Sequence, residues 1–178
     1  MEAPVEILKT RETYEKFSDY FEKKYRSYSL EEFLVIFLRY VPVAARILDV
    51  GCGSGRDLAY FLAKKRCGIG IDVSHGLLRV ARNKLTGADY ILMDMRYLGF
   101  RDCIFDGIWC CASLLHIPKR FAPAVLGEFA RILKKGGKVY LSVKKGRGER
   151  MISSDDRKRF FAFYTMREIT AVLRPRFK

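Results

Sequence analysis

The sequence predicts an α/β fold of the doubly wound, Rossmann-like type, built on a mostly parallel sheet. Short apolar runs alternate with segments of helical periodicity, as expected for parallel strands joined by helices. Three alternating glycines directly follow the first apolar run, and an acidic residue follows each of the next two runs. Because ligands bind at the carboxyl ends of strands in such sheets, these features predict a site at that edge.

Residues 8–40 are predicted to form two helices ahead of the first strand. Aromatic side chains recur at helical spacing over Thr13–Tyr25, and a second amphipathic run covers Leu30–Tyr40. Pro42 ends the second helix. The aromatic stripe is compatible either with a plain core or with a surface that covers a ligand, and both alternatives stay open for Tyr14.

The first strand is predicted at Arg46–Val50, and a glycine loop leads from it into a helix over Leu58–Ala63. Alternating glycines let backbone amides and a helix N-terminus approach a ligand closely. The spacing is G-x-G-x-G, not the G-x-G-x-x-G of dinucleotide-binding proteins. Asp49 lies two residues before the first glycine. Its charge would oppose a pyrophosphate and would suit a cationic ammonium or sulfonium.

The second strand, Cys67–Ser74, contains a carboxylate near its end. Asp72 lies 21 residues after Gly51, the position from which an acidic residue accepts hydrogen bonds from ribose hydroxyls. The alternative is that Asp72 only caps the following helix, Gly76–Leu85. With the glycine loop upstream, the pattern favours ribose binding.

The remaining predicted strands also end in polar segments. Tyr90–Met93 is followed by Asp94, and Phe105–Ala112 is followed by Ser113–Pro118. A helix and a fifth strand come next, then a flexible basic loop and a final helix, and no later run is predicted to supply a further strand pair. These segments are Phe121–Leu133, Lys138–Lys144, Lys144–Arg150 and Met166–Leu173.

The pattern Asp49-x-Gly51-x-Gly53-x-Gly55 resembles motif I of the class I S-adenosylmethionine (SAM) dependent methyltransferases, in their small stand-alone form. The segment Ala130–Val143 resembles another part of that family, with Lys135 where proline is usual. The resemblance implies a sheet of order 3-2-1-4-5. It also implies that strands 6 and 7, the last two of the family's sheet, are missing from this chain.

The same resemblance implies a cofactor, SAM, with S-adenosylhomocysteine (SAH) as its product. His116 is the candidate general base, and the alternative is that it only forms structural hydrogen bonds near the site. Asp94 matches the position that binds the adenine amino group, with Met95 against the ring, and Tyr14 matches the aromatic lid before motif I. No metal site is predicted. The implied cofactor-binding residues are Asp49, Gly51, Cys52, Gly53, Gly55, Asp72, Val73, Asp94, Met95, Cys111 and Tyr14.

The chain of 178 residues is predicted to be a single methyltransferase domain over 1–178. Within it we expect an N-terminal helical lid over 1–45, a cofactor-binding core over 46–145 and a basic C-terminal segment over 146–178. Without strands 6 and 7, the fifth strand would have an open edge. Three alternatives are open. Phe160–Tyr164 could cover that edge, a second copy could pair with it in a homodimer, or the chain could be a shortened form.

The formal charge is +14, and residues 101–178 alone account for +11. This excess indicates RNA or another polyanion as a partner, or else a solvated surface rich in lysine and arginine. The five cysteines are odd in number and form no C-x-x-C pair, which favours reduced thiols. No apolar run approaches the roughly 18 residues of a membrane span. We therefore expect a cytoplasmic protein that does not bind a membrane.

The leading hypothesis is methyl transfer from SAM to an unidentified acceptor, either a small molecule or RNA such as a tRNA. A second hypothesis is a non-catalytic module or partner subunit that binds SAM or SAH. A third is a nucleotide-binding oxidoreductase, which affinity for NAD without affinity for SAH would indicate.

Overall fold

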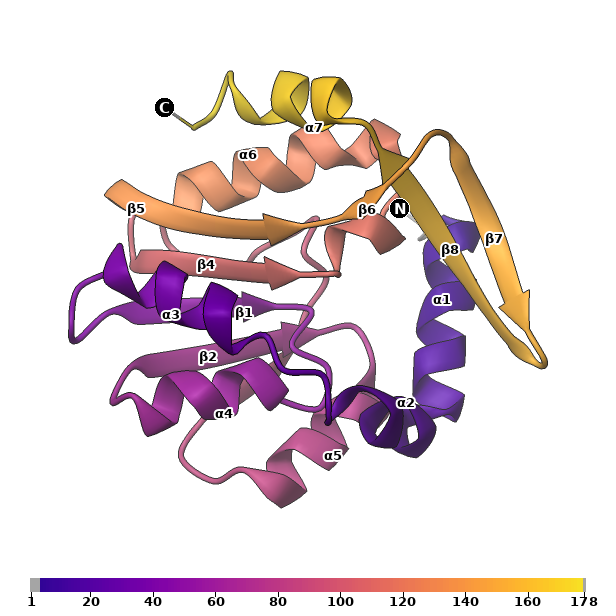
Figure 1. Ribbon diagram of the computed structural model, residues 1–178, viewed down its shortest axis with the longest axis horizontal. Coiled ribbons are helices and arrows are strands. Elements are labelled where there is room, and N and C mark those ends of the chain that lie inside the picture. Colours follow the sequence, from indigo (N-terminus) through magenta and orange to yellow (C-terminus); the bar gives the residue numbers. More distant parts are fainter. Residues whose placement is uncertain (1–3, 178) are drawn as a thin grey trace.

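The computed structural model describes residues 4–177, and its centre is a five-stranded parallel sheet (Figure 1). The observed order, β3-β2-β1-β4-β5, confirms the predicted one. The strands are β1 (Arg46–Val50), β2 (Cys67–Asp72), β3 (Asp89–Leu92), β4 (Phe105–Cys111) and β5 (Leu133–Ser142).

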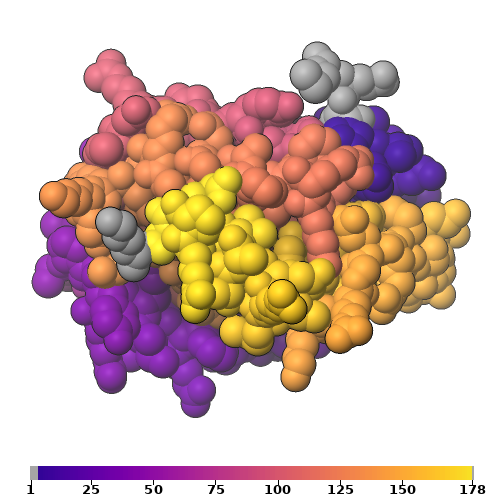
Figure 2. Space-filling model, turned by 90° about the horizontal axis from the view of Figure 1, so that it is seen from above, coloured from indigo at the N-terminus to yellow at the C-terminus, as the bar shows by residue number. Residues whose placement is uncertain are grey.

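Helices cover both faces of this sheet, as the doubly wound prediction requires. One face packs against α3 (Glu31–Arg39), α4 (Arg56–Ala63) and α5 (His75–Lys84), and the other against α6 (Ala122–Ile132). The helix α7 (Met166–Leu173) packs on α6, and Figure 2 shows the C-terminal residues lying over that helix. Two single 3₁₀ turns, Leu114–His116 and Lys119–Phe121, precede α6.

Side-chain alternation along the central strands divides the core into two layers. Ile47 of β1 and Trp109 of β4 face α3 and α4, whereas Leu48 and Ile108 face α6. Trp109 is fully buried and stacks on Tyr140 with ring centroids 3.8 Å apart. Both faces of the central strands are therefore apolar, which is why their sequences read as continuous hydrophobic runs.

The N-terminal region forms three helices, so the prediction of two is wrong. The long aromatic segment is split into α1 (Val5–Lys16) and α2 (Ser18–Tyr25), with Phe17 between them at φ −115° and ψ 31°. The helical spacing of the aromatics continues across this turn, so periodicity alone does not reveal it. The turn folds the two helices together, and the rings of Tyr14 and Phe21 lie 4.6 Å apart.

The region after β5 also differs from its prediction. The segment predicted as a loop contains β6 (Lys144–Lys145) and the start of β7 (Glu149–Ser154), which pairs antiparallel with β8 (Arg157–Tyr164). The charged sequence of β7 lacks strand alternation, and the two-residue turn Asp155–Asp156 has no glycine. These three strands form a separate sheet, so the parallel sheet ends at β5 as predicted.

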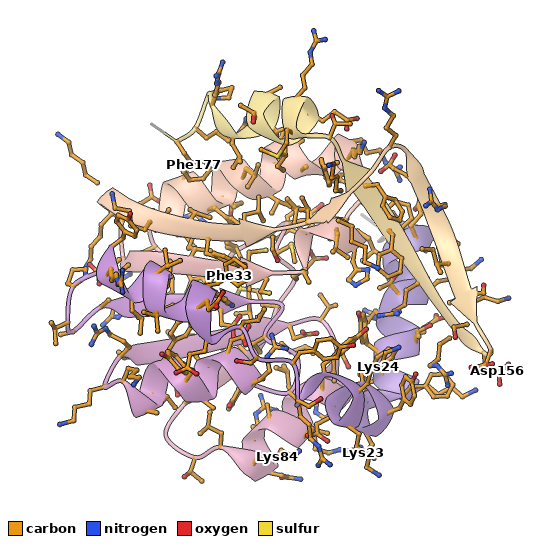
Figure 3. The ribbon with its side chains drawn as sticks, viewed as in Figure 1. Lys23, Lys24, Phe33, Lys84, Asp156 and Phe177 are labelled. Atoms are coloured by element: carbon orange, nitrogen blue, oxygen red, sulfur yellow. The ribbon has the colours of Figure 1, made fainter. Side chains whose placement is uncertain are left out.

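The hairpin of β7 and β8 lies beside α1 at the carboxyl edge of the parallel sheet (Figure 1). The Thr13 hydroxyl donates to the Lys158 carbonyl at 2.6 Å, and the Phe160 amide donates to the Thr10 hydroxyl at 2.9 Å. Asp156 marks the far tip of the hairpin in Figure 3. In residues 4–177, Phe160–Tyr164 pairs with β6 and β7 and no strand pairs with the outer edge of β5.

Among residues 4–177, no helix combines the length and the apolar character that crossing a bilayer requires.

The close approach of Gly51 to the segment after β4 predicts a large loss of stability on substitution. Gly51 has φ +72°, and a Cβ there would lie 1.8 Å from the Ser113 Oγ. Gly136 is the matched control, with φ +80° and no atom within 4 Å of such a Cβ. We expect G136A to lose only the roughly 1–2 kcal/mol of left-handed strain and G51A to lose at least about 2 kcal/mol more. Urea unfolding measures both, and equal losses would contradict the close approach.

Candidate functional site

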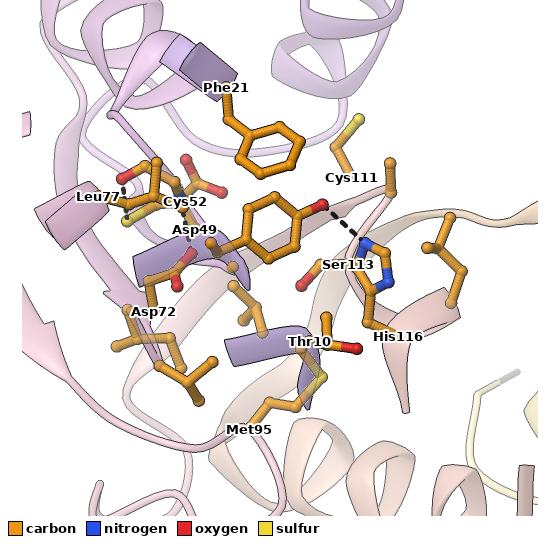
Figure 4. Close-up of a pocket in the computed structure, with 18 of the residues that line it drawn as sticks. Thr10, Phe21, Asp49, Cys52, Asp72, Leu77, Met95, Cys111, Ser113 and His116 are labelled. Carbon is orange, nitrogen blue, oxygen red and sulfur yellow. Dashed lines mark hydrogen bonds between the residues drawn. The ribbon is translucent and has the colours of Figure 1, made fainter. Parts of the chain in front are cut away.

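A cavity of about 450 Å³ lies at the carboxyl ends of the parallel strands. Its floor comes from the ends of β1, β2, β3 and β4, and its roof from α1, α2 and β8. Figure 4 shows Asp49, Cys52 and Asp72 on one side of this cavity and Ser113 with His116 on the other. All the predicted site residues line it except Gly55.

The glycine loop positions the backbone at the cavity floor. Gly51, Gly53 and Gly55 all have positive φ, which a residue with a side chain rarely adopts. A Cβ on Gly53 would meet nothing within 4 Å, so the backbone there leaves open space. Gly55 serves the fold: it precedes α4, and a Cβ there would lie 2.8 Å from the Tyr90 hydroxyl.

Asp49 is the least satisfied polar group of the floor. It is 2% exposed, and its Oδ2 has no hydrogen-bond partner within residues 4–177. Burial, with a smaller contribution from Asp57, raises the pKa of Asp49 well above its usual value. A buried carboxylate of this kind is stabilised by a cation or a hydrogen-bond donor that enters the cavity.

Asp72 is already engaged with the backbone. Its Oδ2 accepts from the Gly53 amide at 2.9 Å, and its Oδ1 accepts from the Ser74 amide at 2.8 Å. Burial raises the pKa of Asp72, and these two amides oppose that shift. Each oxygen keeps a further lone pair, so the carboxylate is held in place and can still accept hydrogen bonds from a ligand.

Asp94 lies in the cavity as predicted, but its carboxylate is paired with Arg96. The Arg96 Nη2 and Nε donate to the Asp94 Oδ2 at 2.7 and 3.0 Å. A ligand amino group would therefore share this carboxylate with a guanidinium. The ion pair fixes the orientation of Asp94.

The roof residue Tyr14 forms a hydrogen bond with His116, which is labelled in Figure 4. The His116 Nδ1 lies 2.7 Å from the Phe160 carbonyl, which only accepts, so Nδ1 carries the proton. The Nε2 then accepts from the Tyr14 hydroxyl at 2.9 Å. Burial lowers the pKa of His116 to about 3 and raises that of Tyr14 to about 12. This geometry favours the alternative in which His116 orients Tyr14, and its role as a base stays a prediction.

Glu15, next to Tyr14, attaches α1 to α5. Its Oε2 accepts from the Gly76 amide at 2.8 Å and from the Ser74 hydroxyl at 3.0 Å. These bonds use the amino end of α5, where a carboxylate is favoured. Glu15 was not predicted, although an acid directly after Tyr14 was an available signal.

Asp57 also went unpredicted. It lines the floor, is 6% exposed and pairs with Arg56 at 2.6 Å. Its Oδ2 accepts from the Trp109 Nε1 at 2.8 Å. The first turn of α4, which follows the glycine loop, is therefore connected to Trp109 through one carboxylate.

Comparison with known proteins identifies the fold and the family. A family profile described as "Methyltransferase domain" matches residues 47–137, which is just over half of the chain. The chain belongs to this methyltransferase domain family. The matched part of the domain begins in β1 and ends in β5, so it contains the floor of the cavity and excludes the roof.

Curated relatives resemble the methyltransferase domain over part of their length. "Methyltransferase GfsG" of Streptomyces halstedii is 33% identical over 109 residues, covering 57% of this chain and 38% of that protein. A tRNA (carboxymethyluridine(34)-5-O)-methyltransferase of Arabidopsis thaliana is 32% identical over 108 residues, covering 60% of this chain and 26% of that protein. The chain therefore spans less than half the length of these relatives.

A solved structure resembles nearly the whole domain. The 1,6-didemethyltoxoflavin-N1-methyltransferase of Burkholderia thailandensis, solved with 1,6-didemethyltoxoflavin and SAH, has a TM-score of 0.78 and 20% identity. The match covers 98% of this chain and 81% of that one. The likeness shows that both chains have the same fold.

The lowered pKa of His116 predicts a pH-dependent contribution to stability. Between the ordinary pKa of 6.5 and about 3, the unfolded chain holds a proton at this position that the folded protein does not. The free energy of unfolding therefore decreases as pH falls through this window. We expect the difference between parent and H116Q to shrink below pH 6.5, by at most about 1.4 kcal/mol per pH unit.

Urea unfolding between about pH 7 and pH 4 measures this difference. H75Q, at an exposed position, is the matched control for loss of a histidine. A difference that stays constant over the range would contradict a buried neutral imidazole at position 116.

Proposed function

We propose that the protein is a SAM-dependent methyltransferase. The observation that carries the proposal is the buried Asp49 carboxylate, whose Oδ2 has no partner in residues 4–177 and lies beside the glycine loop. This group suits a cationic ligand and opposes a pyrophosphate, which argues against the oxidoreductase hypothesis. Membership of the methyltransferase domain family supports the same conclusion.

The residues present fit SAM. Asp49 would bind the cationic part of the molecule, and Asp72 would accept hydrogen bonds from the ribose hydroxyls. Asp94 and Met95 would hold the adenine, with Asp94 kept in orientation by Arg96. The open space at Gly53 allows a ligand to lie against the loop backbone. Cys52, Val73 and Cys111 complete this wall of the cavity.

When bound, SAM supplies a methyl group attached to a sulfonium, and the leaving group of the transfer is the neutral thioether SAH. The protein then mainly has to position the acceptor and exclude water. Aromatic residues of the roof, Tyr14, Phe21 and Phe161, line the cavity and exclude solvent. The hydrogen bond between His116 and Tyr14 sets the orientation of the tyrosine hydroxyl at that wall.

A second candidate is a non-catalytic module that binds SAM or SAH. The observation that favours it is the engagement of His116, whose Nε2 lone pair accepts from Tyr14. An acceptor that must lose a proton would then need a base other than His116. Acceptors that carry their own deprotonated nucleophile need none.

We also propose a revised division of the chain into a core and a lid. We retain the core over 46–145, and we propose that the lid consists of residues from both 1–45 and 146–178. The hydrogen bonds between α1 and β8 support this arrangement. We also retain a cytoplasmic location, which the five free cysteines support, and a homodimer across β5, which light scattering would test.

Calorimetric titration with SAH tests the cofactor site. We expect D72A to weaken binding by about 1–3 kcal/mol, which is roughly 5- to 150-fold, because it removes a buried acceptor. We expect a loss of similar size for D49N, and G53V should place a side chain in the open space beside the loop. D156A, at the hairpin tip, is the control with the same charge change as D72A. Parental affinity in D49N and D72A would place the site elsewhere, and binding of NAD without binding of SAH would indicate the oxidoreductase hypothesis.

Turnover separates the two candidates. Labelled SAM is incubated with a pool of small organic acids, amines and phenols and, separately, with tRNA. We expect label on a member of the small-molecule pool. Tight SAH binding without transfer to any acceptor would support the binding module.

A further inference from the structure

The two sides of the cavity carry opposite charges. The floor contributes the carboxylates of Asp49, Asp72 and Asp94, which the proposed function assigns to SAM. The opposite side contributes the cations of Arg159 in β8 and Lys144 in β6, together with Arg11 of α1. The one acid on that side among the described residues, Glu22 of α2, is paired with Lys84. In residues 4–177, neither Arg159 nor Lys144 has a carboxylate within 4 Å. The proposed function gives the carboxylates of the floor a ligand, but it gives none to Arg159 and Lys144.

Arg159 is enclosed by aromatic rings. Its guanidinium carbon lies 4.8 Å from the ring centroid of Phe21 and 5.1 Å from that of Phe161. Its Nη1 donates to the Tyr14 and Tyr25 hydroxyls at 2.9 and 3.1 Å. The buried Nε has no partner among residues 4–177. A guanidinium has five N–H donors, so several donors of Arg159 have no acceptor within residues 4–177.

Two arginines near the strand ends of the parallel sheet are paired with acids. Arg56, which lines the same cavity, is paired with Asp57, and Arg96 is paired with Asp94. Burying a cation without such a partner is unfavourable. Arg159, which is half-buried, has two hydroxyl partners but no acid partner in residues 4–177.

Lys144 brings a second positive charge to the same place. Its Nζ lies 4.2 Å from the ring centroid of Phe161, the ring that Arg159 also contacts. Lys144 is exposed, and an anion that lies near both cations would offset the repulsion between them. The positive field of both residues also contributes to lowering the pKa of His116, which faces the same side of the cavity.

We propose that Arg159 and Lys144 bind the anionic group, a carboxylate or a phosphate, of a small organic methyl acceptor. The proposal rests on the proposed function, because it assumes that the floor holds SAM. The rings of Tyr14 and Phe161 suit an acceptor with a flat or apolar body. The acceptor is small because α1 covers one side of the cavity, with hydrogen bonds to α5 and to β8.

Ligand-observed NMR titrations on the SAH-saturated protein test the proposal. The probes are benzoate, phenyl phosphate and, as a neutral counterpart of benzoate, benzamide. We expect the parent to bind both anions at least about tenfold more tightly than benzamide, since hydrogen bonds to an ionised group are the stronger ones. In R159M the affinity for the anions should fall at least about tenfold, and the affinity for benzamide should not change.

Matched variants make the result specific. K158M removes a neighbouring exposed cation from the same strand and should bind benzoate like the parent. K144M should weaken anion binding about threefold or more, and R159K should recover part of the loss seen in R159M. Circular dichroism checks that each variant is folded. If R159M is not folded, the anion affinity of R159K is compared with that of the parent instead.

The outcomes distinguish this proposal from the proposed function. Calorimetry should show that R159M still binds SAH, whereas failure of the parent to bind SAH would reject the proposed function. Equal affinity for benzoate and benzamide, or benzoate affinity unchanged in R159M, would overturn the anion site. Binding of tRNA that survives R159M, without binding of any benzene derivative, would also overturn it in favour of a nucleic-acid surface.

Discussion

The hydroxyls of Thr10 and Thr13 hold α1 against β8, and the arrangement of the site depends on this contact. The two segments are separated by about 145 residues in sequence, yet together they roof a cavity whose floor is the edge of the parallel sheet. Because these hydroxyls hold α1 in position, Tyr14 reaches His116 and Glu15 reaches the amino end of α5. Because β8 is placed, Arg159 lies among the aromatic rings of the roof.

The charge of the cavity follows from its two origins. Parallel strands bring their carboxyl-end acids together on the floor, whereas β6 and β8 bring Lys144 and Arg159 to the opposite wall. A cationic ligand such as SAM would meet opposite charge on the floor, and an anionic acceptor would meet opposite charge on the facing wall. His116 lies near the cations and stays neutral, so it does not add to their charge.

The floor could be predicted from sequence because its signals are local. The glycine spacing and the acids after β1, β2 and β3 each lie within one strand–loop segment, and the sheet order follows from the family pattern. Gly55 does not line the cavity, and a glycine that serves the helix start looks the same in sequence as one that faces a ligand. The pairing of Asp94 with Arg96 needed side-chain geometry.

The roof could not be predicted because its signals depend on distant contacts. Nothing in the sequence of β7 shows that it pairs with β8, and Arg159 has its aromatic neighbours only because β8 packs against α1. The turn at Phe17 is likewise hidden, since the aromatic periodicity runs through it. His116 was placed in the site from sequence, but its hydrogen bond to the Phe160 carbonyl depends on a strand that had not been foreseen.

The single tryptophan of the chain gives the molecule a built-in optical reporter. Trp109 stacks on Tyr140, and its indole N–H donates to Asp57, the acid that also pairs with Arg56 beside the glycine loop. Indole emission responds to nearby charge. A cation arriving next to Asp49 would therefore be visible in the intrinsic fluorescence of the unlabelled protein.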